Sequence, residues 1–221
     1  MGSSKKVGVV LAGCGFLDGA EIHEACCTLL ALDKAGVEIV CMAPKTPQMH
    51  VVDHAAGTPE AGASRDVFAE SARIARGELV DLAGVQASEL DALIIPGGFG
   101  VAKNLCTFAV EGPACSINSD IESLIQDMHA AGKPTGFICI APALAAKALG
   151  RHGVTLTIGN DPDTAAGLEQ LGAIHVVCPV DEIVVDEIHR VASTPAYMLG
   201  PSIGPVSRGI EKLVAKVLDW A

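Results

Sequence analysis

The sequence predicts an α/β protein folded as a three-layer, doubly wound sandwich around a mostly parallel sheet. Short aliphatic runs alternate with helical stretches along the 221 residues, as they do where right-handed crossovers join parallel strands. Hydrophobic residues form 50% of the chain and aromatic residues only 3%, a composition typical of strands that are buried on both faces. No repeat or linker interrupts this pattern, so we expect a single domain over residues 1–221.

The amino-terminal half is expected to contribute the first strands of the sheet. Val7–Leu11 is predicted to be a strand because its apolar run leads into a glycine turn, and the following helix, Ala20–Ala35, ends at Gly36. The next expected elements are the strand Glu38–Met42, a short strand at Met49–His54, the amphipathic helix Asp66–Arg76 and the buried strand Asp91–Ile95.

The carboxyl-terminal half continues the alternation, beginning with a helix at Asn118–Ala131 that Asn118 or Ser119 caps and Gly132 closes. The elements expected after it are the strand Thr135–Cys139, the helix Pro142–Leu149, the strand Val154–Ile158, the helix Pro162–Leu171, the strand Ile174–Pro179, a small β-hairpin of Ile183–Asp186 with Arg190–Ser193, and the helix Val206–Trp220. Ligands of such folds bind where the parallel strands end. Three loops lie there: Gly13–Gly19, Pro96–Gly100 and the turn at Cys139.

Charge and cysteine content exclude several classes of function. A net charge of −11 opposes binding to nucleic acids and anionic membranes, and no apolar run approaches the ~18 residues of a membrane helix. The apolar run before Cys14 is too short for a signal-peptide core and is better explained as the first strand. The eight cysteines lack C-x-x-C spacing and the histidines lack metal-ligand spacing. We therefore expect free thiols in a reducing cytoplasm and no metal site.

Cys139 is the candidate nucleophile. It lies between an aliphatic strand and a helix with Pro142 in its first turn, so it must occupy a tight strand-to-helix corner. A thiol at a helix N-terminus experiences the positive end of the helix dipole, which is expected to lower its pKa and favour the thiolate. The alternative is an inert core cysteine, as expected for the other seven.

Two further features are expected near this corner. Gly97 and Gly98 follow a buried strand, and their exposed N–H groups, with that of Ile140, suit an oxyanion hole; an ordinary turn is the alternative. Glu24 lies on the first helix, which begins at the same edge of the sheet. A carboxyl group beside an anionic thiol would have a raised pKa and could carry a proton, whereas the alternative is a solvated side chain on the helix surface.

The glycine-rich loop Gly13–Gly19 resembles a dinucleotide-binding loop after the first strand. However, Asp18, Glu21 and Glu24 lie where the pyrophosphate would sit, and their charge opposes its binding. We therefore expect no nucleotide cofactor, and no other cofactor.

Cys139, Gly97-Gly98 and Glu24 together resemble the site of the class I glutamine-amidotransferase-like superfamily, in the branch of the PfpI protease and the parkinsonism-associated deglycase. Over nearly the whole chain, the sequence is similar to the ElbB-type ("enhancing lycopene biosynthesis") proteins and their mitochondrial relatives. The matching motifs are Gly13-Cys14-Gly15, Asp18-Gly19-Ala20-Glu21-Ile22-His23-Glu24-Ala25, Pro96-Gly97-Gly98-Phe99-Gly100, Ala102-Lys103-Asn104-Leu105, Ala131-Gly132-Lys133-Pro134, Cys139-Ile140-Ala141-Pro142, Val180-Asp181 and Thr194-Pro195-Ala196-Tyr197-Met198.

The resemblance implies a flavodoxin-like sandwich, usually a homodimer, with a reactive cysteine paired to a glutamate. It makes Cys139 the nucleophile and Glu24 its partner, and it makes Gly98 and Ile140 the donors of the oxyanion hole. The expected pocket residues are Gly13, Gly15, Asp18, Gly97 and Asn104. For a eukaryotic source, the resemblance implies a mitochondrial location after removal of a transit peptide.

One departure from the superfamily pattern concerns a histidine. Proteases and amidotransferases of the superfamily have one some way after the cysteine, whereas this chain has Thr157-Ile158-Gly159-Asn160 near that place, and His152 is no clear substitute. Without a Cys–His pair, protease or glutaminase chemistry lacks its usual activation. We therefore expect a cofactor-independent glyoxalase acting on a small aldehyde, glyoxal or methylglyoxal. The alternatives are a redox or carbonyl sensor linked to isoprenoid biosynthesis and an amidotransferase-like hydrolase.

Overall fold

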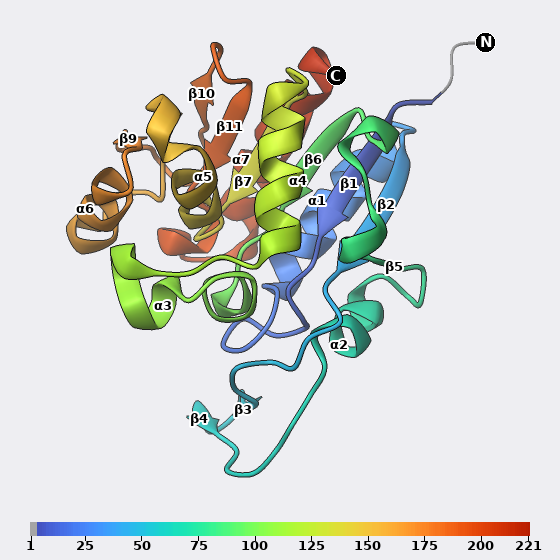
Figure 1. The fold of residues 1–221 in the computed structure, drawn as a ribbon, viewed down its shortest axis with the longest axis vertical. Helices are drawn as coiled ribbons and strands as arrows, with labels where there is room; N and C mark the ends of the chain where they lie inside the picture. Colours follow the sequence, from blue (N-terminus) through green and yellow to red (C-terminus); the bar gives the residue numbers. More distant parts are fainter. Residues whose placement is uncertain (1–3) are drawn as a thin grey trace.

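A computed structural model describes residues 4–221 as a central sheet covered by helices on both faces (Figure 1). Within these residues the main sheet has the strand order β10-β11-β7-β6-β1-β2-β5. Its strands are β1 (Lys6–Val10), β2 (Glu38–Ala43), β5 (Val80–Asp81), β6 (Ala92–Ile95), β7 (Thr135–Ile138), β10 (Val184–Asp186) and β11 (Val191–Thr194). Every neighbouring pair is parallel except the β10–β11 hairpin. The predicted doubly wound sandwich with a mostly parallel sheet and a small hairpin is confirmed.

The helices form the two outer layers of the sandwich. They are α1 (Ile22–Lys34), α2 (Val67–Ile74), α3 (Phe108–Glu111), α4 (Ser119–Ala130), α5 (Pro142–Leu149), α6 (Pro162–Gln170) and α7 (Ile203–Trp220). Helices α4 and α5 cover the front of the sheet in Figure 1, and α1 and α7 pack together behind it. Each parallel crossover thus returns the chain to the same sheet edge, which collects the loops that follow β1, β6 and β7.

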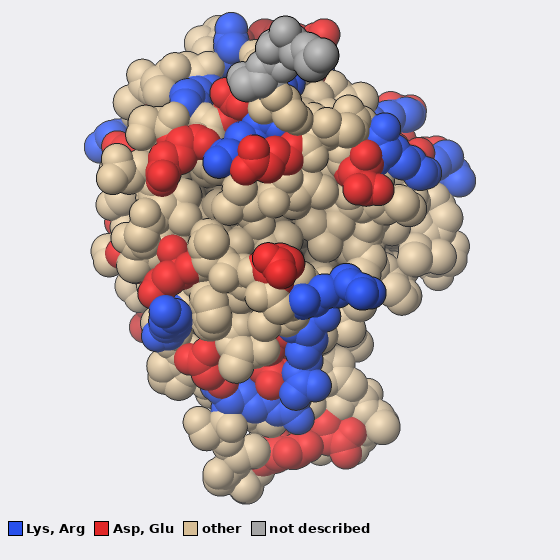
Figure 2. Space-filling view, turned by 90° about the vertical axis from the view of Figure 1, so that its right-hand side faces the viewer, with Lys and Arg blue, Asp and Glu red and all other residues tan. Residues whose placement is uncertain are grey.

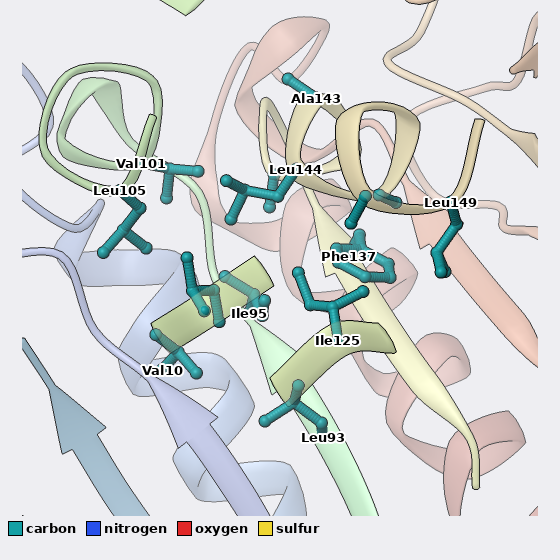
Figure 3. Close-up of a cluster of buried hydrophobic side chains, with 14 of the residues drawn as sticks. Val10, Leu93, Ile95, Val101, Leu105, Ile125, Phe137, Ala143, Leu144 and Leu149 are labelled. Carbon is teal, nitrogen blue, oxygen red and sulfur yellow. The ribbon is translucent and has the colours of Figure 1, made fainter. Parts of the chain in front are cut away.

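The core has two halves because successive strand residues point to opposite faces of the sheet. Val10, Leu93 and Phe137 belong to the half beneath α4 and α5 (Figure 3). Their neighbours Val9 and Ile94 belong to the half beneath α1 and α7. Burial on both faces explains why the strands are aliphatic without polar alternation.

Three predicted strands differ from the structure. Met49–His54 contains only β3 (Val52–Asp53), which pairs with β4 (Thr58–Pro59) in a two-stranded hairpin apart from the main sheet (Figure 1). Val154–Ile158 and Ile174–Pro179 shrink to β8 (Thr155–Leu156) and β9 (Ile174–His175), which pair with each other. Side chains accept the backbone hydrogen bonds of this region in place of a strand partner: Thr155 N–H donates to the Asp186 carboxylate at 2.8 Å, and Thr157 N–H donates to the Ser193 hydroxyl at 2.9 Å. The segment therefore does not extend the main sheet.

Short elements escaped the sequence prediction. The edge strand β5 has only two residues, and a π-helix, η3 (Val101–Leu105), follows the loop after β6. The first helix starts two residues later than predicted because Glu21 is its N-cap, accepting a hydrogen bond from Glu24 N–H at 2.7 Å.

Acidic and basic side chains are intermixed on the face drawn in Figure 2. Within residues 4–221, no helix is long and apolar enough to cross a membrane.

Candidate active site

Cys139 occupies a strained corner between β7 and α5. Its φ angle is +62°, in the left-handed region that non-glycine residues rarely adopt. Its N–H donates to Thr194 O in β11 at 2.9 Å, and Pro142 opens the helix three residues later. Such a conformation costs on the order of 1–3 kcal/mol and persists only where the surroundings enforce it. The tight corner expected from the sequence is confirmed, and it has the form of a nucleophile elbow.

Glu24 is fully buried against this corner. One carboxylate oxygen accepts from Gly97 N–H at 2.9 Å and the other from Tyr197 N–H at 3.2 Å. The carboxyl group is also hydrogen-bonded to the Cys139 side chain. Segments that follow β6, β7 and β11 therefore converge on the first turn of α1, and Glu24 is not the solvated side chain of the alternative interpretation.

The environment of Glu24 raises its pKa to about 8. Burial is the main cause and the negative charge of Glu21 the second, while the N–H groups of Tyr197 and Gly97 and the bond to Cys139 act in the opposite direction. At neutral pH this carboxyl group is mostly protonated. The direction agrees with the sequence prediction, but the main cause is removal from water rather than a neighbouring thiolate.

The pKa of Cys139 is also raised, well above its ordinary value. Burial contributes most, followed by the charge and hydrogen bond of Glu24, whereas the N–H groups of Gly98 and Ile140 act to lower it. The expectation that the helix N-terminus would dominate and favour the thiolate is wrong, because loss of hydration outweighs two backbone donors here. The thiol is neutral until a proton leaves the pair.

Gly98 and Ile140 direct their N–H groups at the Cys139 sulfur. Gly98 has a φ of +100°, and a Cβ atom there would lie 2.4 Å from Glu21 N, so only glycine fits. A Cβ atom on Gly97 would lie 2.4 Å from the Cβ of Cys139. The two glycines thus allow the loop after β6 to approach the corner closely, and the two predicted oxyanion donors lie together.

A cavity of about 450 Å³ opens beside this corner. Its lining residues are Phe16, Glu21, Gly98, Phe99, Ala102, Phe108, Ala109, Cys139, Ile140, Thr164, Tyr197 and Met198. They come from the loops after β1 and β6, from the turn after β7, from η3, α3 and α6, and from the segment after β11. The cavity therefore lies at the carboxyl ends of the parallel strands, where the fold predicts ligand binding.

The five residues expected to form the pocket do not line this cavity. Gly13, Gly15 and Asp18 instead belong to the loop after β1, and Asn104 lies in η3, from which it holds that loop. The Asn104 amide donates to Ala12 O at 3.0 Å and Asp18 O at 2.9 Å, and the Asp18 carboxylate accepts from Val52 N–H at 2.8 Å. The fifth residue, Gly97, lies beneath the Cys139–Glu24 pair. The family motifs include residues that support the loops as well as residues that line the cavity, so the resemblance alone could not tell which of them face the cavity.

Within residues 4–221, neither of the positions considered from the sequence supplies the histidine that superfamily proteases use. Thr157 is buried, and its hydroxyl accepts from Gly159 N–H at 2.9 Å. His152 lies past the far end of α5, where its ring packs against those of His129 and His189. Among residues 4–221, no group of three or more His, Cys, Asp or Glu residues is arranged to hold a metal ion.

Sequence reasoning missed the contributions of Glu21 and Tyr197. Glu21 caps α1, lines the cavity and raises the pKa of Glu24. Tyr197 donates its backbone N–H to Glu24, and its hydroxyl lies 2.8 Å from His23 Nδ1. Any residue other than proline can donate a backbone N–H, so this role of Tyr197 could not be predicted from its residue type, although Tyr197 does lie in one of the family motifs.

Comparisons with known proteins identify the family of the chain. No family model matches the chain. The human protein "Glutamine amidotransferase-like class 1 domain-containing protein 3, mitochondrial" is 47% identical over 223 aligned positions, covering 97% of this chain and 82% of that protein. The crystal structure of an isoprenoid biosynthesis protein with amidotransferase-like domain from Ehrlichia chaffeensis is 36% identical, with a TM-score of 0.91 and coverage of 98% and 99% of the two chains. The chain belongs to this amidotransferase-like, ElbB-type family.

One further relative and one more distant solved structure are also similar to the chain. The "ES1 protein homolog, mitochondrial" of Rattus norvegicus is 46% identical over 97% of this chain and 83% of its own length. A DJ-1 superfamily protein from Agrobacterium tumefaciens shares only 18% identity but has a TM-score of 0.59, covering 98% of this chain and 91% of that chain. That likeness shows that the two chains share the sandwich fold. The family membership inferred from the sequence motifs is confirmed by the human and Ehrlichia relatives.

Proposed function

We propose that the protein is a cofactor-independent glyoxalase that converts glyoxal to glycolate and methylglyoxal to lactate. One observation carries the proposal: the buried Glu24 carboxyl is hydrogen-bonded to Cys139, at a corner where two backbone N–H groups converge beside an open cavity. Nucleophile, proton carrier and oxyanion donors are the groups that an internal redox reaction of an oxoaldehyde needs.

The reaction proceeds through a covalent adduct of Cys139. The sulfur adds to the aldehyde carbon, and the carbonyl oxygen takes up a proton to give a hemithioacetal. Glu24 removes the hydrogen of that carbon as a proton, and Gly98 and Ile140 donate to the enediolate oxygen. Return of the proton to the neighbouring carbon reduces that carbon and leaves the sulfur-bound carbon oxidised as a thioester. Water then hydrolyses the thioester, which releases the hydroxy acid and the thiol.

The reaction requires the Cys139–Glu24 pair to lose one of its two protons. The remaining proton can lie on either group, so the pair titrates as a unit. Because the pKa of Glu24 is about 8, the reactive form accumulates as the pH rises through that value. Turnover is therefore expected to increase between about pH 7 and 9.

Glyoxal turnover combined with intact-mass analysis tests the proposal. Wild-type protein and Cys26→Ser should form glycolate without lasting gain of mass, whereas Cys139→Ser should form none. Cys26 is a matched control because it is an exposed cysteine on α1. Turnover by Cys139→Ser would refute the mechanism. A stable adduct on Cys139 without turnover would instead favour the carbonyl-sensor alternative.

We also propose that the protein is a homodimer in a reducing compartment. The mitochondrial names of the human and rat relatives support that compartment for a eukaryotic source, and the free cysteines are compatible with it. Light scattering at micromolar concentration should give the mass of two chains, and a monomer mass would refute the dimer.

A further inference from the structure

The cavity beside Cys139 is much larger than glyoxal. Its volume of about 450 Å³ lies within the ~300–1,000 Å³ of clefts that bury drug-sized ligands. Glyoxal has only two carbon atoms and would leave most of this space to water. The geometry therefore leaves room for a substituent beyond the reacting carbonyl groups.

The lining of the cavity is aromatic in a chain that has few aromatic residues. The sequence contains five Phe, one Tyr and one Trp, and three of the Phe and the Tyr line this cavity. Phe16 and Phe99 are 48% and 47% exposed, so they do not serve the core. Half-exposed phenyl rings that face one cavity with a nucleophile are typical of a site for an apolar or aromatic group.

These rings are held in place before any ligand binds. Phe99 N–H donates to Phe16 O at 2.8 Å, which ties the loop after β6 to the loop after β1. The Lys103 ammonium lies 5.0 Å from the centre of the Phe99 ring and donates to Leu17 O at 2.9 Å. The Phe108 ring packs closely over Gly167 of α6. A preorganised surface loses little entropy when it binds a rigid group.

We infer that the substrate is an α-oxoaldehyde whose ketone carbon carries an apolar group about the size of a phenyl ring. This inference rests on the proposed function and deepens it. The sulfur of Cys139 adds to the aldehyde carbon, and the side chains of Phe16, Phe99 and Phe108 contact the substituent. With phenylglyoxal and water, the steps described above balance to mandelate, as the aldehyde carbon is oxidised and the ketone carbon reduced.

The test compares kcat/KM for phenylglyoxal and for glyoxal, with mandelate and glycolate quantified against protein-free controls. Wild-type protein should prefer phenylglyoxal roughly ten-fold or more, and Phe99→Ala should reduce the preference by a similar factor. Phe68→Ala is the matched control, because Phe68 lies outside the cavity with Lys45 at 5.1 Å from its ring centre. An equal or better kcat/KM for glyoxal, with a ratio unchanged by Phe99→Ala, would overturn the inference.

A binding measurement separates this inference from the proposed function. Acetophenone has the phenyl ketone but no aldehyde, so it cannot form the adduct. Saturation-transfer NMR should detect its binding to wild-type protein and to Phe68→Ala, and weaker binding to Phe99→Ala. Phe99-dependent binding without turnover of either oxoaldehyde would refute the glyoxalase function and retain an apolar ligand. Failure of acetophenone to bind would refute the apolar ligand class itself.

Discussion

The two edges of the sheet each hold a cluster of titratable side chains, and the clusters behave in opposite ways. At the carboxyl edge, Glu24 and Cys139 are buried together and both have raised pKa values. At the amino edge, the rings of His129, His152 and His189 pack with centroids 4.7 Å and 5.5 Å from that of His129. Burial and the charges of the other two histidines lower the pKa of His129.

The carboxylates at the two edges explain this contrast. Asp186, beside the histidines, accepts from the N–H groups of Thr155, Ile188 and His189 and from His189 Nδ1. Burial raises the pKa of Asp186, but the donors of Thr155 and His189 and the charge of His189 outweigh it and hold the pKa below its usual value. Asp186 is therefore ionised, and its hydrogen bonds hold neighbouring loops together. Glu24 has fewer donors and is more deeply buried, so it is a protonated acid beside a cavity. A cluster of ionisable residues indicates chemistry only where its groups are left able to exchange protons.

The largest expected effect is the loss of turnover in Glu24→Gln. Removing the base should lower the rate by about 10²–10⁴-fold. Asp186→Asn is the matched change at the other edge: it should leave glyoxal turnover unchanged but lower the free energy of unfolding by about 1–3 kcal/mol, because an amide nitrogen would face N–H donors. Steady-state kinetics and urea unfolding measure both. Unchanged turnover in Glu24→Gln would remove Glu24 from the mechanism.

The raised pKa of Glu24 should also make the free energy of unfolding decrease with rising pH. Its folded pKa of about 8 lies above the ordinary 4.5, so its protonated form contributes full stability below pH 4.5, and this contribution is lost as the pH rises to 8. Each pH unit in that window changes the free energy of unfolding by about 1.4 kcal/mol. The difference in the free energy of unfolding between wild type and Glu24→Gln, measured by urea unfolding, should therefore fall by about 5 kcal/mol across this window. Parallel curves would show that Glu24 ionises normally.

Much of the fold could be predicted because burial on both faces leaves a strong pattern. The strands β1, β6 and β7 are short runs that are almost wholly buried, and the helix α4 before β7 has a clear cap at Asn118. The segment Met49–His54 was over-predicted because only Val52 and Asp53 pair as a strand, and they pair with β4 in a local hairpin rather than with a strand of the main sheet. The backbone at β8 donates to the side chains of Asp186 and Ser193, which are distant in sequence, so its place beside the main sheet could not be predicted.

The candidate site was less predictable than the fold. The corner at Cys139 follows from the absence of any loop before Pro142, and the family motifs supplied Glu24. The sign of the Cys139 pKa shift could not be predicted, because the helix dipole is visible in sequence but the depth of burial is not. Nor could the role of Tyr197, which acts on Glu24 through its backbone N–H. Contacts that backbone groups make between segments at the sheet edge can be identified only once the three-dimensional fold is known.

A smaller effect is expected from Glu21→Gln. The charge of Glu21 raises the pKa of Glu24, so its removal should move the midpoint of the pH–turnover profile below 8. The glutamine oxygen can still accept from Glu24 N–H, as Glu21 does at 2.7 Å, and so preserve the cap of α1. Asp33→Asn, an exposed change in the last turn of the same helix, is the control and should leave the midpoint unchanged. An unchanged midpoint in Glu21→Gln would show that its charge does not reach Glu24.

The smallest expected effect concerns His129 at the amino edge and has the opposite sign. Because its folded pKa lies below the ordinary 6.5, the unfolded chain binds a proton first, and stability is lost as the pH falls through 6.5. The neighbouring Arg151 adds to the repulsion, while Asp186 opposes it. His129→Phe keeps a ring that can stack on His189, so the acid-side loss of stability should become shallower while turnover at pH 8 stays unchanged. Urea unfolding between about pH 5 and 7, with the exposed His50→Gln as control, measures the change. An acid-side curve identical to wild type would mean that the histidines contribute packing alone, and that opposite pH responses do not distinguish the two edges.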